Sequence, residues 1–164
     1  MAVKQTPLRT LKKVSGRLLR LLSGQSEKSS QEPPVQRMLV VDDEEAICFS
    51  MSDYFSHHGY KVETAKDFDE AERLIETTDF SVIIQDLRLG VTRNPDGLDI
   101  IERARERNPD TRIIVLTAYG SAEVEDEARR RGASAFLRKP KPLSQVAQVV
   151  QGLIESPSKK ARSA

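Results

Sequence analysis

Residues 81–89 read Ser81-Val-Ile-Ile-Gln-Asp-Leu-Arg-Leu89, an apolar run of β-branched residues that stops at an aspartate. Val82, Ile83 and Ile84 predict a strand buried on both faces, as in a parallel sheet covered by helices. Such a strand delivers the side chain of Asp86 to the carboxyl edge of the sheet, where open α/β sheets bind their ligands. Asp86 is therefore the first residue to consider for chemistry.

Strand and helix patterns alternate on both sides of this segment. Further short apolar strands are predicted at residues 37–41, 61–65, 112–116 and 135–138. Helical periodicity follows every strand, over residues 46–58, from 67 onward, and over 97–107, 121–131 and 143–154. This alternation predicts an α/β domain, a flavodoxin-like (βα)5 doubly wound parallel sheet. In the flavodoxin-like strand order, 2-1-3-4-5, strands one and three meet at the switch point.

The composition fits one folded domain with tails. The chain has 164 residues, with 26 Lys and Arg against 25 Asp and Glu, and its net charge of +1 gives no sign of nucleic-acid binding. The single cysteine, Cys48, excludes an internal disulfide and fits a reducing cytosol. No run approaches the eighteen or so apolar residues of a membrane span, so we expect a cytoplasmic protein.

The residues before the first strand form a predicted extension. Residues 1–24 predict a basic amphipathic helix, which can lie at the inner face of the membrane, fill a groove on a partner, or remain a solvated tail. Residues 25–36, with Ser, Gln and Glu and a proline pair, predict a flexible linker. The folded domain is predicted to span residues 37–155, and residues 156–164 a disordered basic tail.

Polar side chains follow four of the predicted strands. Asp42 and Asp43 follow the first strand, Asp86 the third, Thr117 ends the fourth, and Lys139 follows the fifth. Three carboxylates in one crevice repel each other unless a cation lies among them, and their oxygen ligands suit Mg²⁺. A free oxygen of Asp86 could then attack phosphorus, with Lys139 and Thr117 contacting the phosphoryl oxygens.

Each of these residues also has an ordinary structural interpretation. Asp42 and Asp43 alone would be a helix N-terminal cap pair, Lys139 a surface lysine, and Thr117 a strand-end hydroxyl. Similarly, the run Arg129-Arg130-Arg131 predicts a solvated helix end, with contact to an acidic partner as the alternative. Only the convergence of the polar residues at one sheet edge favours a functional site.

Four motifs carry a resemblance to a known family. Over about residues 37–155 the chain resembles the receiver domain of two-component response regulators, in the stand-alone, CheY-like form. The motifs stand in order at the expected strand ends, and they are Val41-Asp42-Asp43-Glu44, Asp86-Leu87-Arg88, Leu116-Thr117-Ala118 and Arg138-Lys139-Pro140.

The resemblance implies a role for each of these residues. Asp86 would accept a phosphoryl group from a histidine kinase or phosphotransfer protein. Mg²⁺ would be held by Asp42 or Asp43, by Asp86, and by the backbone carbonyl of Arg88. Thr117 would move toward the phosphoryl group and Phe136 would turn inward with it, which would switch a partner-binding face formed by the helix at 121–131, the strand at 135–138 and the helix at 143–154. The bond between Lys139 and Pro140 is expected to be cis.

The chain departs from the family pattern beside the phosphoacceptor. Gly90 stands where the family usually has proline, and Val91 to Pro95 resemble a small insertion, which is either a longer surface loop or an element that contacts a partner. Arg88 and Tyr119 occupy the positions that flank the path of the hydrolytic water in the family. Both are bulky, which suggests that they shield an aspartyl phosphate.

Three functions fit these observations. The first is a phosphorylation-dependent switch without an output domain of its own, acting on a downstream protein. The second is a phosphorylation-independent scaffold or adaptor localised by the N-terminal helix. The third is a phosphatase of the haloacid dehalogenase kind, although such enzymes place an Asp-x-Asp motif after the first strand and Asp42-Asp43 lacks that spacing.

Overall fold

The computed structural model describes residues 35–89 and 97–156. In this part of the chain five strands form one parallel sheet in the order β2-β1-β3-β4-β5, which confirms the predicted flavodoxin-like fold. The strands are β1 (Arg37–Val41), β2 (Lys61–Ala65), β3 (Val82–Gln85), β4 (Arg112–Thr117) and β5 (Ala135–Arg138). The predicted amphipathic helix, most of the linker, the insertion at Val91 to Pro95 and most of the basic tail lie outside the described residues, and those predictions stay open.

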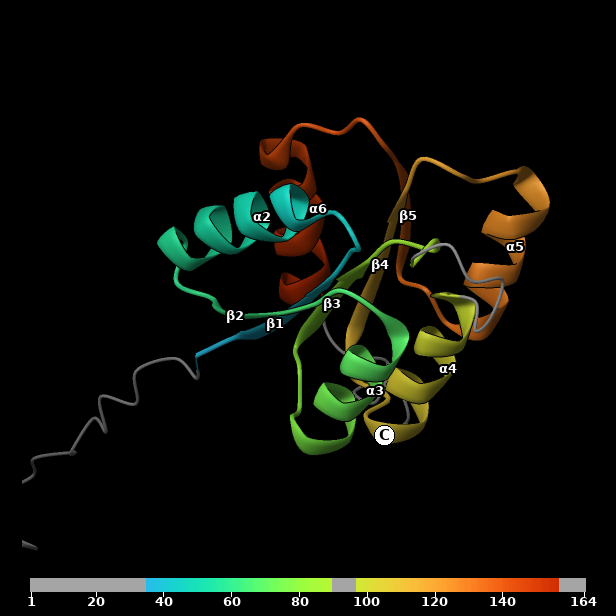
Figure 1. The fold of residues 1–164 in the computed structure, drawn as a ribbon, viewed down its shortest axis with the longest axis horizontal. Helices are drawn as coiled ribbons and strands as arrows, with labels where there is room; N and C mark the ends of the chain where they lie inside the picture. The colour runs from blue at the N-terminus through green and yellow to red at the C-terminus, as the bar shows by residue number, and fades with distance from the viewer. Residues whose placement is uncertain (1–34, 90–96, 157–164) are drawn as a thin grey trace, which may run out of the picture. The chain divides into compact units, whose positions relative to one another are not determined.

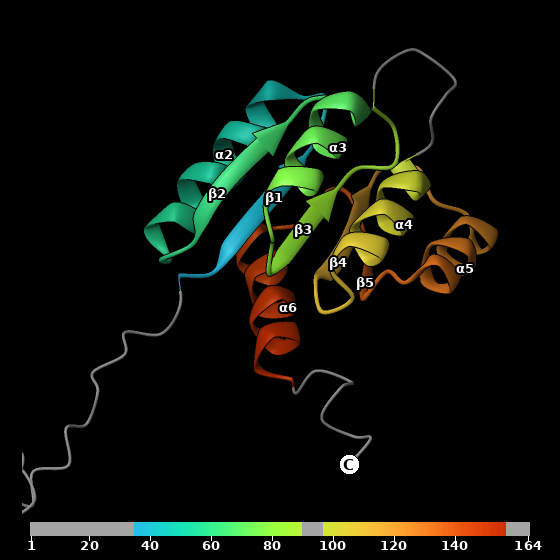
Figure 2. The ribbon, with the colours of Figure 1, turned by 90° about the horizontal axis from the view of Figure 1, so that it is seen from below.

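Helices cover both faces of the sheet. Figures 1 and 2 show α2 and α6 on one face, with α3, α4 and α5 on the other. The helices are α2 (Glu45–His57), α3 (Phe68–Thr77), α4 (Gly97–Arg107), α5 (Ala122–Arg131) and α6 (Leu143–Glu155). Within the described segments, no helix is long and apolar enough to cross a membrane.

Two apolar clusters fill the space between the sheet and the helices on its two faces. The side chain of Ile83 packs toward α3, α4 and α5, whereas those of Val82 and Ile84 pack toward α2 and α6. This alternation is why the strand sequence is apolar at successive positions, because neither of its faces meets solvent. Cys48 is buried in the second cluster.

Local sequence signals set the helix starts. The side chain of Asp67 accepts a hydrogen bond from the backbone N–H of Glu70 at 2.8 Å, and that of Ser121 accepts one from Val124 at 3.4 Å. The Glu70 carboxylate in turn accepts from the backbone N–H of Lys66, an arrangement that resembles a capping box. These caps place α3 and α5 soon after the strands that precede them.

The parallel register brings the strand ends to one edge. Val41 pairs with Gln85, Gln85 with Val115, and Thr117 with Arg138, so the carboxyl ends of these four strands lie at the same edge of the sheet.

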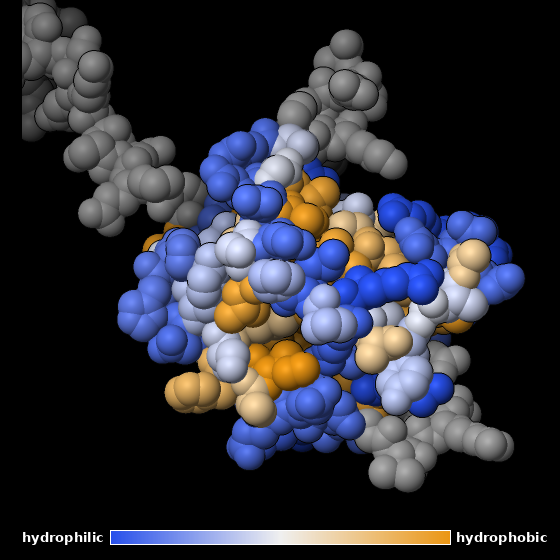
Figure 3. All heavy atoms as spheres, turned by 90° about the horizontal axis from the view of Figure 1, so that it is seen from above, coloured by the Kyte–Doolittle hydropathy of each residue, from blue (hydrophilic) through white to orange (hydrophobic). Residues whose placement is uncertain are grey.

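On the face drawn in Figure 3, hydrophobic residues lie in small groups separated by hydrophilic ones. Among the described residues, the exposed large apolar side chains are Val35, Phe49 and Tyr119.

Candidate functional site

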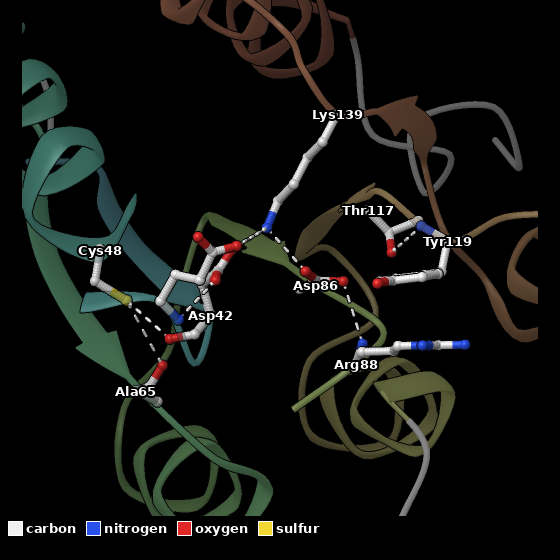
Figure 4. Close-up of polar contacts among 9 residues, drawn as sticks. Asp42, Cys48, Ala65, Asp86, Arg88, Thr117, Tyr119 and Lys139 are labelled. Atoms are coloured by element: carbon white, nitrogen blue, oxygen red, sulfur yellow. Dashed lines mark hydrogen bonds and ion pairs between the residues drawn. The ribbon is translucent and has the colours of Figure 1, made fainter. Parts of the chain in front are cut away.

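Lys139 joins two buried carboxylates at the carboxyl edge of the sheet. Its Nζ lies 2.6 Å from Oδ2 of Asp42, which follows β1, and 2.8 Å from Oδ2 of Asp86, which follows β3 (Figure 4). Asp42 is 3% exposed and Asp86 6% exposed. The peptide bond from Lys139 to Pro140 is cis, as expected from the sequence. Three of the predicted site residues therefore meet in a single ionic cluster.

The second oxygen of each carboxylate binds a backbone N–H. Oδ1 of Asp42 accepts from the N–H of Glu44 at 3.0 Å, and Oδ1 of Asp86 accepts from that of Arg88 at 3.1 Å. The side chain of each aspartate thus accepts a hydrogen bond from the backbone N–H two residues further along, a common local arrangement for aspartate in turns. Both oxygens of each carboxylate are held, and the two side chains have little rotational freedom.

Burial and the shared cation act in opposite directions on the pKa values. Burial is the largest influence on Asp42 and raises the pKa of its carboxyl, while the hydrogen bond from Lys139 opposes that rise. For Lys139 burial lowers the pKa, but the hydrogen bonds and charges of Asp42 and Asp86 together outweigh it, so the pKa of the ammonium is raised. Lys139 is therefore firmly protonated in the folded domain.

The remaining predicted metal ligands lie beside this cluster. Asp43 is exposed next to Asp42, and in the described part of the chain no three His, Cys, Asp or Glu side chains gather closely enough to hold a metal on their own. The two buried carboxylates present only oxygen, so the donor set fits Mg²⁺, which accepts few protein ligands and keeps several waters. Further ligands would have to come from Asp43, the carbonyl of Arg88 or water.

Thr117 and Phe136 lie on the neighbouring strands β4 and β5. Thr117 is fully buried, and its Oγ1 accepts a hydrogen bond from the backbone N–H of Tyr119 at 3.1 Å. The Phe136 ring is 9% exposed and already lies inward, beside Gly120. A Cβ on Gly120 would be 2.7 Å from Cζ of this ring and 3.7 Å from Cγ2 of Thr117. Ring, glycine and threonine therefore pack as one group.

Arg88 and Tyr119 form a stacked pair beside Asp86. The guanidinium carbon of Arg88 lies 3.5 Å from the centroid of the Tyr119 ring (Figure 4). This is a cation–π contact between residues that follow two different strands. The two side chains predicted to shield the phosphoryl group are thus in contact with each other.

Sequence reasoning missed three residues of this region. Glu44 lies with its carboxylate 3.8 Å from the Nζ of Lys139, and its sequence position beside Asp43 was the available signal. Gln85 is fully buried and donates from Nε2 to the carbonyl of Gly97. The signal for Gln85 was its position as a polar residue at the end of an apolar strand. No feature of the sequence pointed to Gly97 as a residue of this site.

A doubly wound parallel sheet with an Asp–Lys–Asp cluster at its carboxyl edge defines a class of phosphoacceptor domain. The model of the response regulator receiver domain matches residues 38–151, and the chain belongs to this family. Residues 38–151 are therefore a phosphoacceptor signalling module of the two-component type.

Two curated relatives illustrate the sequence similarity. The photosynthetic apparatus regulatory protein RegA of Cereibacter sphaeroides is 33% identical over 119 residues, which cover 73% of this chain and 63% of that protein. The alginate biosynthesis transcriptional regulatory protein AlgB of Pseudomonas aeruginosa is 35% identical over 104 residues, covering 63% of this chain and 22% of AlgB. The chain thus spans less than two thirds of the length of either relative.

Solved structures agree with the family. A response regulator from Burkholderia pseudomallei, determined with a phosphorylated aspartic acid, a calcium ion and citrate, has a TM-score of 0.67 at 33% identity, over 73% of this chain and 68% of that one. The beryllofluoride-activated receiver domain dimer of NtrC4 has a TM-score of 0.66 at 36% identity, over 73% of this chain and 96% of that one.

Proposed function

We propose that the domain accepts a phosphoryl group on Asp86 and transmits that event to a partner protein. The observation that supports this most strongly is the position of Lys139 between Asp42 and Asp86, with all three side chains at the carboxyl edge of the sheet. A buried carboxylate beside a protonated lysine is a nucleophile with a cation ready for the phosphoryl oxygens.

The chemical step follows from this placement. A carboxylate oxygen of Asp86 attacks phosphorus, an O–P bond forms, and the bond between phosphorus and the donor atom breaks with its electron pair leaving on the donor. In a phosphohistidine donor the imidazole nitrogen receives that pair and then a proton. Lys139 exchanges its contact with Asp86 for a contact with a phosphoryl oxygen, and the hydroxyl of Thr117 donates to another.

Asp42, Asp43, Asp86 and the backbone carbonyl of Arg88 are the groups that we propose to hold Mg²⁺. When bound, the ion neutralises charge that develops on the phosphoryl oxygens. Asp42 contributes because its carboxylate is fixed by Glu44 and Lys139 before any ligand arrives. Holding this carboxylate in place lowers the ordering cost of binding a small cation that tolerates little geometric error.

The output of the switch is proposed to be the surface of α5, β5 and α6. Thr117 ends β4, and the loop after it passes Gly120 before α5 begins at Ala122. A shift of Thr117 toward a phosphoryl group would disturb the packing of Thr117 and of Phe136 around Gly120, and with it the start of α5. The partners are then a histidine kinase or phosphotransfer protein as donor and a downstream protein on this surface. We place these events in the cytoplasm, in keeping with the lone thiol of Cys48.

Intact-mass measurement tests the proposal. Wild-type protein incubated with Mg²⁺ and acetyl phosphate should gain the mass of one phosphoryl group, and Asp86→Asn should gain none. Asp69→Asn, at a surface position on α3, is the matched control and should label like the wild type. Failure of the wild type to label would favour a phosphorylation-independent scaffold.

A further inference from the structure

Gln85, the residue before the phosphoacceptor, is buried and only half satisfied. Its side chain has no exposed surface, and its Nε2 donates to the backbone carbonyl of Gly97, the first residue of α4. Its Oε1 is the single buried side-chain oxygen or nitrogen without a hydrogen-bond partner among the described residues. An unpartnered buried acceptor reduces stability, so packing alone does not explain an amide here.

Gly97 is held on both sides of the phosphoacceptor. Its carbonyl accepts from Gln85, and its N–H donates to the carbonyl of Leu87 at 3.2 Å. Its backbone also packs directly on the residues between, because a Cβ at Gly97 would lie 2.7 Å from the carbonyl oxygen of Asp86 and 2.7 Å from Cα of Leu87. Gln85, Gly97 and Leu87 thus form a clasp around the backbone of Asp86.

We propose that Gln85 is a positioning residue for phosphorylation at Asp86, an inference that rests on the proposed function. The clasp fixes the backbone from Asp86 to Arg88. That backbone carries the N–H that holds Oδ1 of Asp86 at 3.1 Å and the Arg88 carbonyl proposed as a metal ligand. On the other side, the N–H of Asp86 donates to the carbonyl of Val41 at 2.8 Å. Without the Gln85 bond, the backbone around Asp86 keeps its hydrogen bond to Val41, and on the α4 side it keeps only the 3.2 Å bond from the N–H of Gly97 to the carbonyl of Leu87.

A positioning role and a merely structural role predict different results for Gln85→Met. Methionine is apolar and similar in length, and it removes the unpartnered oxygen together with the amide that binds Gly97. If the role is positioning, the melting temperature stays the same or rises while phosphorylation slows. If the amide serves only packing, rate and melting temperature change together or not at all.

The matched control is Thr111→Val. Thr111 is also buried, and its Oγ1 donates to the carbonyl of Phe80 at 2.8 Å, at the opposite edge of the sheet from Asp86. The substitution likewise removes one buried hydrogen bond from a side chain to a backbone carbonyl. It should lower the melting temperature and leave the phosphorylation rate unchanged.

The experiment measures three quantities on the full chain: the initial rate of labelling by acetyl phosphate with Mg²⁺, the melting temperature, and amide hydrogen exchange by NMR. For Gln85→Met we expect labelling to slow by roughly tenfold and the Mg²⁺ concentration needed for half-maximal labelling to rise by roughly tenfold. Exchange of the Gly97 and Arg88 amides should accelerate about tenfold in metal-free protein, with the Asp86 amide unchanged.

Wild-type labelling and unchanged exchange in a folded Gln85→Met variant would overturn the inference. So would a loss of rate that merely follows a loss of melting temperature. A second measurement needs no variant: the side-chain amide protons of Gln85 should exchange far more slowly than those of exposed Gln145, and equal rates would also overturn it. If wild-type protein does not label at all, the proposed function is wrong, and the exchange rates alone then decide whether the clasp exists.

Discussion

At the level of single residues, Lys139 compensates two carboxylates that would otherwise be buried together. Asp42 and Asp86 come from strands β1 and β3, and each directs Oδ2 at the same ammonium. Buried charges are tolerated when they are paired and hydrogen-bonded, and removal of one partner leaves the others uncompensated. The lysine is therefore a structural counter-ion and, in the proposed function, the cation that contacts a phosphoryl oxygen.

Replacing Lys139 by methionine should lower the free energy of unfolding in EDTA at neutral pH by about 1–3 kcal/mol, because two carboxylates lose their shared cation. The folded state raises the pKa of Lys139 above its ordinary value of 10.5. Its stabilising contribution is thus fully present below pH 10.5 and is lost as the pH rises through the folded-state pKa. The difference between wild type and variant should shrink there.

Urea denaturation over a series of pH values measures this difference. Lys61→Met, at an exposed lysine on β2, should show no comparable loss at neutral pH. A gap between wild type and Lys139→Met that stays constant through strongly alkaline pH would contradict the role given to the ammonium.

The stacked pair of Arg88 and Tyr119 should prolong the life of the phosphorylated state. Removing either side chain exposes the position beside Asp86 to water, so Arg88→Ala and Tyr119→Ala should each speed hydrolysis roughly twofold to fivefold, the range expected from one cation–π contact. The loss of phosphoryl mass after removal of acetyl phosphate gives the rate. Arg103→Ala on α4 is the control, and equal lifetimes in all four proteins would rule out shielding.

The sequence predicted the charged part of the site because charged residues at strand ends are conspicuous. Asp42, Asp86 and Lys139 could be placed at one edge once the alternation of strands and helices was recognised. Gln85 could not be assigned a contact, since its partner is a backbone carbonyl twelve residues away whose position depends on the packing of α4.

At the level of elements, the β4–α5 connection links the site to the proposed output surface. Thr117, Gly120 and the Phe136 ring are packed within van der Waals reach, and only a residue without a Cβ fits between the ring and the threonine. Helix α5 is in turn tied to α4 by Arg131, whose Nη1 lies 2.8 Å from Oδ1 of Asp99. A movement of Thr117 would therefore be transmitted to α5, a helix that is tied to α4 by this ion pair.

Gly120→Ala should destabilise the domain by about 1–3 kcal/mol, because its Cβ would lie 2.7 Å from Cζ of Phe136 and force the ring to move. The penalty should be smaller when Phe136 is leucine, which lacks the far end of the ring. A double-mutant cycle by urea denaturation measures this coupling. Additive losses in Gly120→Ala and Phe136→Leu would show that the ring does not occupy this space.

The arginine run on α5 shows what periodicity cannot foresee. The sequence predicted a solvated helix end for Arg129-Arg130-Arg131, and Arg129 and Arg130 do pair with glutamates of their own helix. Arg131 also pairs with Glu127 of its own helix, and in addition it joins Asp99 on α4, thirty-two residues earlier in the sequence. Helix positions and apolar faces follow from local spacing, whereas an ion pair between helices depends on how the helices pack.

At the level of the whole molecule, the fold assembles the site from distant parts of the sequence. Asp42 and Lys139 are ninety-seven residues apart in the sequence and 2.6 Å apart in space. The two carboxylates lie close together only in the folded state, so a cation that binds both of them should bind the folded chain and not the unfolded one. Cation binding is then linked to global stability.

Mg²⁺ should therefore raise the melting temperature. At a free concentration of about one hundred times its dissociation constant the gain in free energy of unfolding should be about 2.7 kcal/mol, and EDTA should reverse it. Asp42→Asn should lose most of this gain, because one of the two buried carboxylates is gone. Thermal melts at matched ionic strength with NaCl provide the control, and an equal gain in wild type and variant would place the cation elsewhere.

Chemical mapping of the phosphorylated residue tests the assignment of Asp86 against its acidic neighbours. Borohydride reduces an aspartyl phosphate to homoserine, so treatment of the acetyl phosphate-labelled protein marks the acceptor permanently and peptide mass spectrometry locates it. We predict homoserine at position 86, and none at positions 42 or 43. Homoserine at position 42 or 43 would contradict the account. So would the absence of homoserine from all three positions, 42, 43 and 86, in protein that has gained the phosphoryl mass.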